Sequence, residues 1–130
     1  MRFYTQHHQF YCGIDLHART MYLCVLNADG EIVLHRNMQA GPEPLLKALA
    51  PDREDLVVCV EGLFTWSWLA DLCTPEGMPF VWGHALYMKA SQGGKAQNEK
   101  IDAQKIAVLL RGGMLPPAYV YPAAMRATRD

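Results

Sequence analysis

Four acidic residues have the types and spacing to hold divalent cations. Asp15 interrupts the apolar stretch YCGIDLH, where a carboxylate is unfavourable unless it is paired or binds a cation. Glu61 directly follows the continuous apolar run LVVCV. Glu99 and Asp102 are three residues apart in a segment with a helical pattern, which places both side chains on one side of that helix.

Four carboxylates from three distant segments suit the chemistry of phosphates and hard cations. Mg²⁺ is bound by oxygen ligands, often one or two carboxylates together with phosphate and water. Two such ions about 4 Å apart hold the attacking and leaving oxygens during phosphodiester chemistry. A simpler structural interpretation stays open for two of the acids. Glu99 could stabilise the start of its helix electrostatically, and Glu61 could be an exposed strand end. Asp15 is the hardest to explain in this way.

The elements that must position these acids begin with an antiparallel meander. Its three strands are expected at residues 11–17, 21–27 and 31–36. These segments are rich in β-forming residues, and Asp29-Gly30 is a strong tight-turn signal between the last two. Because side chains alternate along a strand, Gly13, Asp15 and His17 share one face.

Helices and strands then alternate. Helices are expected at residues 43–50, 64–73 and 98–111, and strands at residues 56–60 and 79–82. The segment from Pro75 to Gly77 is expected to end the second helix. Since strand–helix–strand units form right-handed parallel crossovers, the order predicts an α/β fold with a mixed sheet. In that sheet three antiparallel strands are followed by parallel strands with crossover helices.

The last helix is expected to bring its two acids to the sheet. Ala103, Ile106 and Leu110 continue the side of the helix that carries Glu99 and Asp102, so this side should pack against the strands. The side chains of Lys100, Gln104 and Lys105 should point away.

The composition predicts one small domain. The chain has 130 residues, of which 51% are hydrophobic and 19% charged, which fits a single folded domain and argues against disorder. We find no apolar run of about 18 residues and no signal-peptide core, so we expect a cytoplasmic protein without a membrane partner. The four cysteines, Cys12, Cys24, Cys59 and Cys73, lack metal-site or disulfide spacing and are expected to be buried free thiols.

The near-neutral net charge of −1 hides an asymmetry. Residues 1–84 carry 5 Lys/Arg and 10 Asp/Glu, whereas residues 85–130 carry 7 Lys/Arg and 3 Asp/Glu. A basic segment close to an acidic cluster suits a polyanion, although solvated helix faces have the same composition. The candidate phosphate contacts are Lys89, Lys95, Lys100, Lys105 and Arg111.

Several ordered motifs resemble one known family. Gly-Ile-Asp-Leu-His at 13–17, Val-Glu-Gly at 60–62 and Lys-Ile-Asp-Ala at 100–103 are similar to motifs of the DEDD transposases. These are the RuvC-like recombinases of bridge-RNA-guided insertion sequences, related to Piv-type DNA invertases. Gly-His-Ala at 83–85, Leu-Leu-Arg-Gly-Gly at 109–113 and Leu-Pro-Pro-Ala-Tyr-Val at 115–120 continue the resemblance. It covers nearly the whole chain from residue 11.

The resemblance implies a ribonuclease H-like (RuvC-like) fold and a metal-dependent recombinase. The family's four acidic positions correspond to Asp15, Glu61, Glu99 and Asp102, which would be the catalytic residues and the ligands of Mg²⁺ or Mn²⁺. At Glu99 the family usually has aspartate, so this side chain is longer by one methylene. The implied partners are DNA, a guide RNA and further copies of the chain, and the implied reaction is DNA strand transfer.

The resemblance also suggests how the chain is divided. We expect a flexible N-terminus at residues 1–10, a RuvC-like domain at residues 11–113 and, at residues 114–130, the start of a connection to a C-terminal domain. In the family that domain supplies a serine thought to attack DNA. This chain ends before it, so we expect a truncated transposase or an isolated RuvC-like domain. Apolar surface could then be uncovered at residues 118–121, which are candidates for self-association.

Two other interpretations stay open at this stage. The chain could be a catalytically inactive remnant that serves as a nucleic-acid-binding or dimerisation module, given Glu99 and the absent C-terminal part. An actin-like nucleotide-binding fold has the same order of elements. It would need glycine-rich phosphate loops, for which Gly13 alone is thin support.

Overall fold

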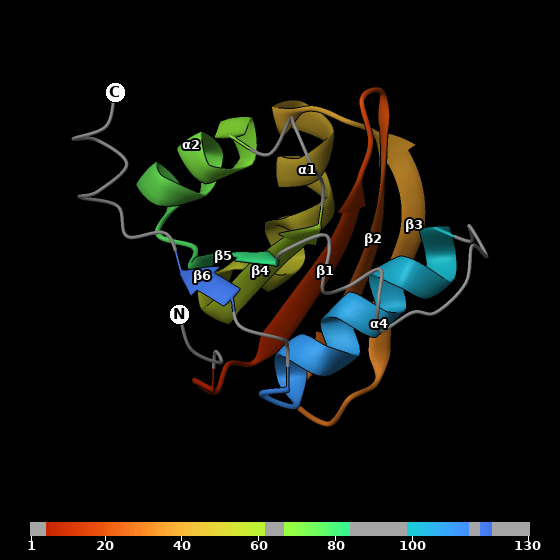
Figure 1. The fold of residues 1–130 in the computed structure, drawn as a ribbon. Helices are drawn as coiled ribbons and strands as arrows, with labels where there is room; N and C mark the ends of the chain where they lie inside the picture. The colour runs from red at the N-terminus through yellow and green to blue at the C-terminus, as the bar shows by residue number, and fades with distance from the viewer. Residues whose placement is uncertain (1–4, 62–66, 84–98, 115–117, 121–130) are drawn as a thin grey trace.

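A six-stranded mixed sheet organises the computed structural model, which describes residues 5–61, 67–83, 99–114 and 118–120 (Figure 1). The strands are β1 (Phe10–Leu16), β2 (Thr20–Asn27), β3 (Ile32–Gln39), β4 (Leu56–Glu61), β5 (Phe80–Gly83) and β6 (Ala118–Val120). The helices are α1 (Pro42–Leu49), the 3₁₀ helix η1 (Ala50–Asp55), α2 (Ser67–Glu76) and α4 (Glu99–Arg111). The strand order across the sheet is β3-β2-β1-β4-β5-β6.

The predicted meander is confirmed. β1 pairs with β2, and β2 with β3, both in antiparallel orientation. In the β2–β3 turn Gly30 has a φ of 87°, a conformation that favours glycine. The side-chain oxygen of Asn27 accepts hydrogen bonds from the backbone N–H groups of Asp29 (3.0 Å) and Glu31 (2.9 Å) and so closes the turn.

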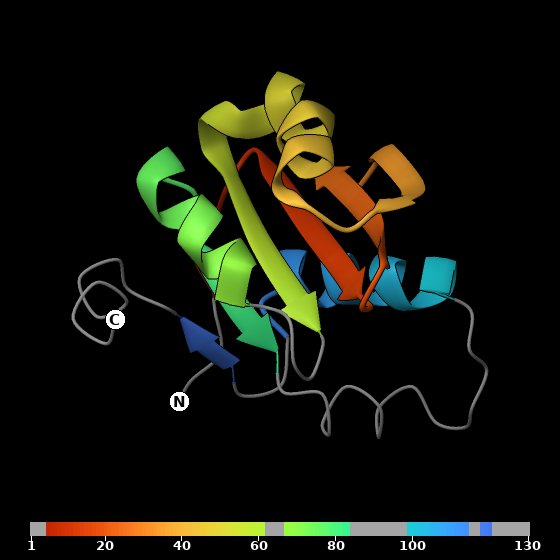
Figure 2. The same cartoon turned by 90° about the horizontal axis from the view of Figure 1, so that it is seen from above.

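Parallel strands extend the meander on the other side of β1, as predicted. β4 lies parallel to β1, and β5 lies parallel to β4. Figure 2 shows α1 and α2 on one face of the sheet and α4 on the other. This arrangement confirms the mixed α/β fold class. None of the helices in the described segments is long and apolar enough to cross a membrane.

The core lies on both faces of the sheet, because each central strand alternates its side chains between them. Facing α1 and α2, the buried cluster includes Cys12, Ile14 and Leu16 from β1 and Val58 and Val60 from β4. On the face of α4, the buried residues are Tyr11, Cys24, Leu26, Val57, Cys59, Val81, Ala103, Ile106, Ala107 and Leu110. The alternation therefore directs Asp15 and Glu61 toward the face that α4 covers.

The end of α2 differs from the expectation. The helix does not end before Pro75 but includes it and continues to Glu76. Gly77 then takes a φ of 74°, and the backbone N–H of Met78 donates to the carbonyl oxygen of Cys73 at 3.0 Å. This closure satisfies a carbonyl of the last turn, so the helix can accommodate one proline there. The predicted start at residues 64–66 lies outside the described residues.

The strand β6 was not predicted. Residues 118–120 belong to the expected connecting segment and self-association surface, and their backbone pairs with β5 in antiparallel orientation. A strand of three residues carries too little alternation to be recognised in the sequence.

The N-terminal segment contacts the start of β4. Nδ1 of His8 lies 2.8 Å from Oδ1 of Asp55, and the backbone N–H of Gln9 donates to Oδ2 of Asp55 at 3.0 Å. The hydrogen bond from His8 lowers the pKa of Asp55 most, and the one from Gln9 lowers it further. Two contacts with the Asp55 carboxylate therefore join His8 and Gln9, which belong to the expected flexible segment 1–10, to the domain.

The prediction of buried free thiols is confirmed for all four cysteines. Burial raises the pKa of Cys24 to about 11 and that of Cys73 to about 12, and it raises the pKa of Cys12 well above its usual value. Since the thiolate is the reactive form, native protein at pH 8 should not react with a disulfide reagent within minutes, whereas unfolded protein should expose four thiols. Rapid labelling of a native thiol would contradict this prediction.

Candidate active site

Asp15 and Glu61 are neighbours at the carboxyl ends of the two central strands. The register of the parallel strands β1 and β4 makes them Cα partners. Asp15 is the next-to-last residue of β1, and Glu61 is the last residue of β4. Open α/β sheets place their ligands at the carboxyl ends of their strands. Both are nearly inaccessible, with exposed fractions of 4% for Asp15 and 7% for Glu61. The sheet therefore fixes two buried carboxylates side by side.

Asp102 approaches this pair from α4. The helix can lie directly on β1 because Gly13 has no side chain there. A Cβ on residue 13 would be 2.5 Å from the carbonyl oxygen of Ala103 and 2.6 Å from the backbone nitrogen of Ala107. As predicted, Ala103, Ile106 and Leu110 face the sheet and are buried. Asp102 is half-buried and lies near enough for its charge to act on Asp15.

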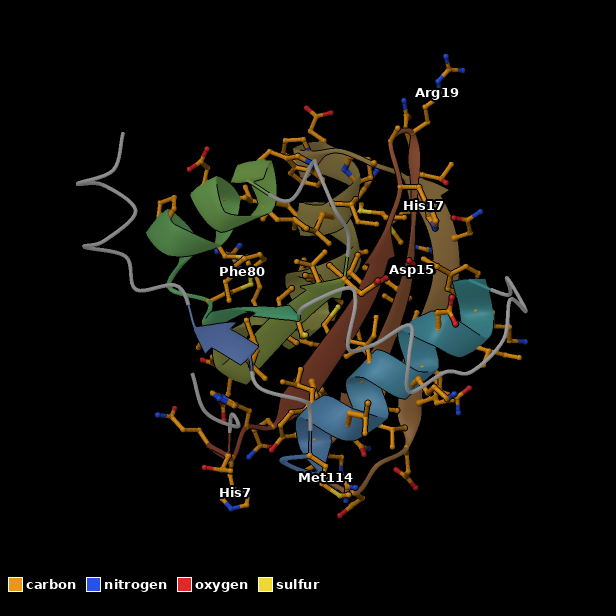
Figure 3. The ribbon with its side chains drawn as sticks, in the orientation of Figure 1. His7, Asp15, His17, Arg19, Phe80 and Met114 are labelled. Atoms are coloured by element: carbon orange, nitrogen blue, oxygen red, sulfur yellow. The ribbon has the colours of Figure 1, made fainter. Side chains whose placement is uncertain are left out.

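The electrostatics of the site centre on Asp15. Its pKa rises from 3.8 to about 6, first because burial disfavours the charged form. His17 opposes this rise, since its Nε2 lies 3.4 Å from Oδ1 of Asp15, whereas the negative charges of Glu61 and Asp102 add to it. Figure 3 shows Asp15 and His17 in succession along the β1–β2 hairpin, with Arg19 at its tip. The site thus gathers negative charge that a cation would stabilise.

The donor set fits a hard divalent cation in its chemistry. All the candidate ligands are carboxylates, and two are held rigidly by neighbouring strands. Within residues 5–61, 67–83, 99–114 and 118–120, however, no three His, Cys, Asp or Glu side chains are close enough together to hold a metal ion. Glu99 begins α4, three residues before Asp102, and its side chain is outside the described part of the structure.

The predicted phosphate contacts fall into three groups. Lys100 is exposed and Lys105 half-exposed, and both belong to α4. Arg111 lies at the far end of α4, about 13 Å along the helix from Asp102. Its Nε donates to the carbonyl oxygen of Ala28 at 3.0 Å. Lys89 and Lys95 lie outside the described residues.

One residue near the site was not singled out in the sequence. His35, on β3, makes a hydrogen bond from its Nε2 to the carbonyl oxygen of Lys100 at 3.1 Å. The two residues are 65 positions apart, and no local pattern relates them. Only the register of β3 on β2 and the placement of α4 bring them together.

Comparison with known families assigns the chain to a group. A family model of DEDD transposases of the IS110 type, described as a transposase, matches residues 12–130. The chain belongs to the DEDD transposase family. A search of curated protein sequences finds no match to this transposase chain.

The fold of this transposase chain is similar to that of RuvC. The structure of T. thermophilus RuvC in complex with a Holliday junction substrate matches with a TM-score of 0.60 and 16% identity, over 88% of this chain and 100% of that chain. A second Thermus thermophilus RuvC structure is 18% identical over 90% of this chain and 86% of that chain, with a TM-score of 0.48. The first match shows a RuvC-like, ribonuclease H-like fold.

Proposed function

We propose that this chain is the RuvC-like metal-binding domain of a DNA transposase and acts in divalent-metal-assisted strand transfer. The observation that carries the proposal is the buried pair of carboxylates, Asp15 and Glu61, on neighbouring parallel strands. Asp102 adds a third negative charge from the opposing helix. Family membership and the RuvC-like fold support the assignment.

Asp15, Glu61, Glu99 and Asp102 are the proposed catalytic residues and ligands of Mg²⁺ or Mn²⁺. Bound metal would activate an attacking oxygen and stabilise the charge that develops on a phosphodiester. The protein's own contribution is to fix Asp15 and Glu61 through the sheet, while His17 orients the Asp15 carboxylate. Lys89, Lys95, Lys100, Lys105 and Arg111 are the proposed contacts to nucleic-acid phosphates.

DNA is the proposed principal partner. The RuvC structure that resembles this domain is described in complex with a Holliday junction substrate. A guide RNA is a further proposed partner, on the resemblance to transposases of bridge-RNA-guided insertion sequences. Assembly into homo-oligomers is also proposed, with which β3 and β6, the outer strands of the described sheet, are consistent. Residues 114–130 are the proposed start of a connection to a C-terminal domain. Four free thiols fit the reducing cytoplasm.

A second candidate function is a catalytically inactive module that binds nucleic acid or forms dimers. Glutamate at position 99 and the spacing of the described carboxylates, which do not form a three-ligand group, favour it. Strand transfer by this chain would contradict the second candidate.

Calorimetric titration with Mn²⁺ tests the first proposal. Wild type should bind the ion, and Asp15→Asn should bind it at least tenfold more weakly, because the variant removes a ligand charge from the centre of the site. Glu54→Gln is the matched control, since Glu54 is an exposed acid in η1, at the opposite end of β4 from Glu61. Equal affinities of wild type and Asp15→Asn would remove Asp15 from the site. Absence of binding by wild type would favour the inactive module.

A further inference from the structure

The two halves of α4 are attached to the sheet very differently. In the C-terminal half, Ile106 and Leu110 are buried in a cluster with Tyr11, Val57, Cys59 and Val81. In the N-terminal half, the side chains of residues 100–105 are described, and among these six Ala103 alone is buried. A methyl group permits close approach, but it offers little resistance to rotation or sliding. Among the described residues, the end of the helix that carries the acids therefore has the weaker apolar attachment, since Ala103 contributes only a methyl group to its cluster with Cys24 and Leu26.

His35 supplies a polar attachment at that end. It is the Cα partner of Cys24 and lies on the sheet face covered by α4, where its Nε2 donates to the carbonyl oxygen of Lys100 at 3.1 Å. The His35 ring meets the ring of Tyr22 edge to face, with centroids 5.3 Å apart and an interplanar angle of 84°. Tyr22 is in turn the Cα partner of Asp15. A chain of contacts thus runs from Asp15 on β1 through Tyr22 and His35 to the first turn of α4.

We propose that His35 is a positioning residue that fixes the first turn of α4, and with it Glu99 and Asp102, relative to Asp15. Lys100 lies between the two acids in the chain. Holding its carbonyl oxygen therefore fixes the rotation of α4 about its axis and its position along the sheet, and with them the positions of both acids. Metal sites tolerate displacements of roughly 0.2 Å in ligand position. A small pivot of α4 about its well-packed C-terminal half would therefore weaken binding. The role in metal binding rests on the proposed function, whereas the attachment of the helix does not.

Three variants separate this role from a general effect on stability. His35→Leu keeps the volume and removes the donor. His35→Gln keeps a side-chain N–H that can reach the Lys100 carbonyl. Arg36→Leu is the matched control, since Arg36 is exposed on the same strand and alternation directs it to the other face. Each variant is compared with wild type by hydrogen exchange of metal-free protein and by calorimetric titration with Mn²⁺.

We expect His35→Leu to exchange about fivefold faster in residues 101–106, with no change in residues 107–111, because one partly exposed hydrogen bond is lost. Its Mn²⁺ affinity should fall about tenfold, as for other residues that orient a ligand. His35→Gln should recover most of both effects, and Arg36→Leu should match wild type.

Each result decides one part of the proposal. Unchanged exchange in residues 101–106 of His35→Leu would overturn the attachment. Faster exchange with wild-type Mn²⁺ affinity would overturn the positioning role. If wild type itself fails to bind Mn²⁺, the proposed function and the metal-positioning role fail together, while the exchange experiment still decides whether His35 holds the helix.

Discussion

The Gly13→Ala variant is expected to melt about 10 °C below wild type and to lose most of its Mn²⁺ affinity. The new Cβ would lie 2.5 Å from the carbonyl oxygen of Ala103 and 2.6 Å from the backbone nitrogen of Ala107. Carbon in contact with such atoms normally sits about 3.5 Å away. Because both atoms belong to the backbone of α4, no side-chain rotation can relieve the overlap, and the helix and β1 must separate.

The size of the effect follows from the rigidity of both partners. Forcing extra volume into a packed interface costs typically 1–3 kcal/mol, and a clash with backbone lies at the upper end, at about 3 kcal/mol. In a domain of this size that corresponds to a fall of about 10 °C in melting temperature. The separation also moves Asp102 away from Asp15, so metal affinity should fall together with stability.

Gly112→Ala is the matched control for this variant. Gly112 follows α4 directly, and a Cβ there would meet its nearest atom, the carbonyl oxygen of Val108, at an ordinary 3.4 Å. Thermal unfolding monitored by circular dichroism should place this control within about 2 °C of wild type, since an unstrained Gly→Ala change alters stability by about 1 kcal/mol or less. A Gly13→Ala protein that melts with wild type would show that α4 does not lie so close to β1.

Much of the fold could be predicted because its signals are local. The Asp29-Gly30 turn, the apolar run that became β4 and the alternation in β1 each specify an element within a few residues. The residues of the candidate acidic site could be proposed for a similar reason. A carboxylate at position 15 conflicts with its apolar neighbours, and the family motifs supply the other acids.

What could not be predicted depends on contacts between distant segments. The acceptance of Pro75 in α2 depends on the closure between Met78 and Cys73, and the pairing of β6 depends on β5 being available beside it. The contact between His35 and Lys100 depends both on the register of β3 against β2 and on the position of α4 along the strands. The close approach at Gly13 is also visible only when helix and strand are placed together.

Asp15→Asn is expected to stabilise metal-free protein at pH 7 by about 2–3 kcal/mol. The pKa of Asp15 rises from 3.8 to about 6 on folding, chiefly because the carboxylate is buried, and each pKa unit corresponds to about 1.4 kcal/mol. At pH 7 the folded protein therefore holds an ionised group that is more stable in the unfolded chain. Asparagine has nearly the same shape and no charge, so it removes this penalty together with the repulsion from Glu61 and Asp102.

The difference in stability between wild type and Asp15→Asn should depend on pH, with a sign set by the raised pKa of Asp15. A group whose pKa is raised in the folded state binds its proton more tightly there, so its contribution to stability falls as pH rises from about 4 to about 6. Below pH 4 Asp15 is protonated in both states, and wild type and Asp15→Asn should be equally stable. Above pH 6 the full difference should be present. Urea unfolding at several pH values, with Glu54→Gln as a control expected to run parallel to wild type, measures the difference between the curves.

Divalent metal should narrow the difference in stability between the two proteins. A cation at the site compensates the charge of Asp15, so Mn²⁺ at about 100 times its dissociation constant should stabilise wild type by about 2.7 kcal/mol. Asp15→Asn should gain much less at the same concentration, because it has lost a charged ligand. The charge that lowers the stability of the metal-free fold is thus the charge that the metal requires. Equal stabilisation of both proteins by Mn²⁺ would place the ion elsewhere, and superimposable pH curves without metal would show that the Asp15 carboxylate is not held in a buried, charged state.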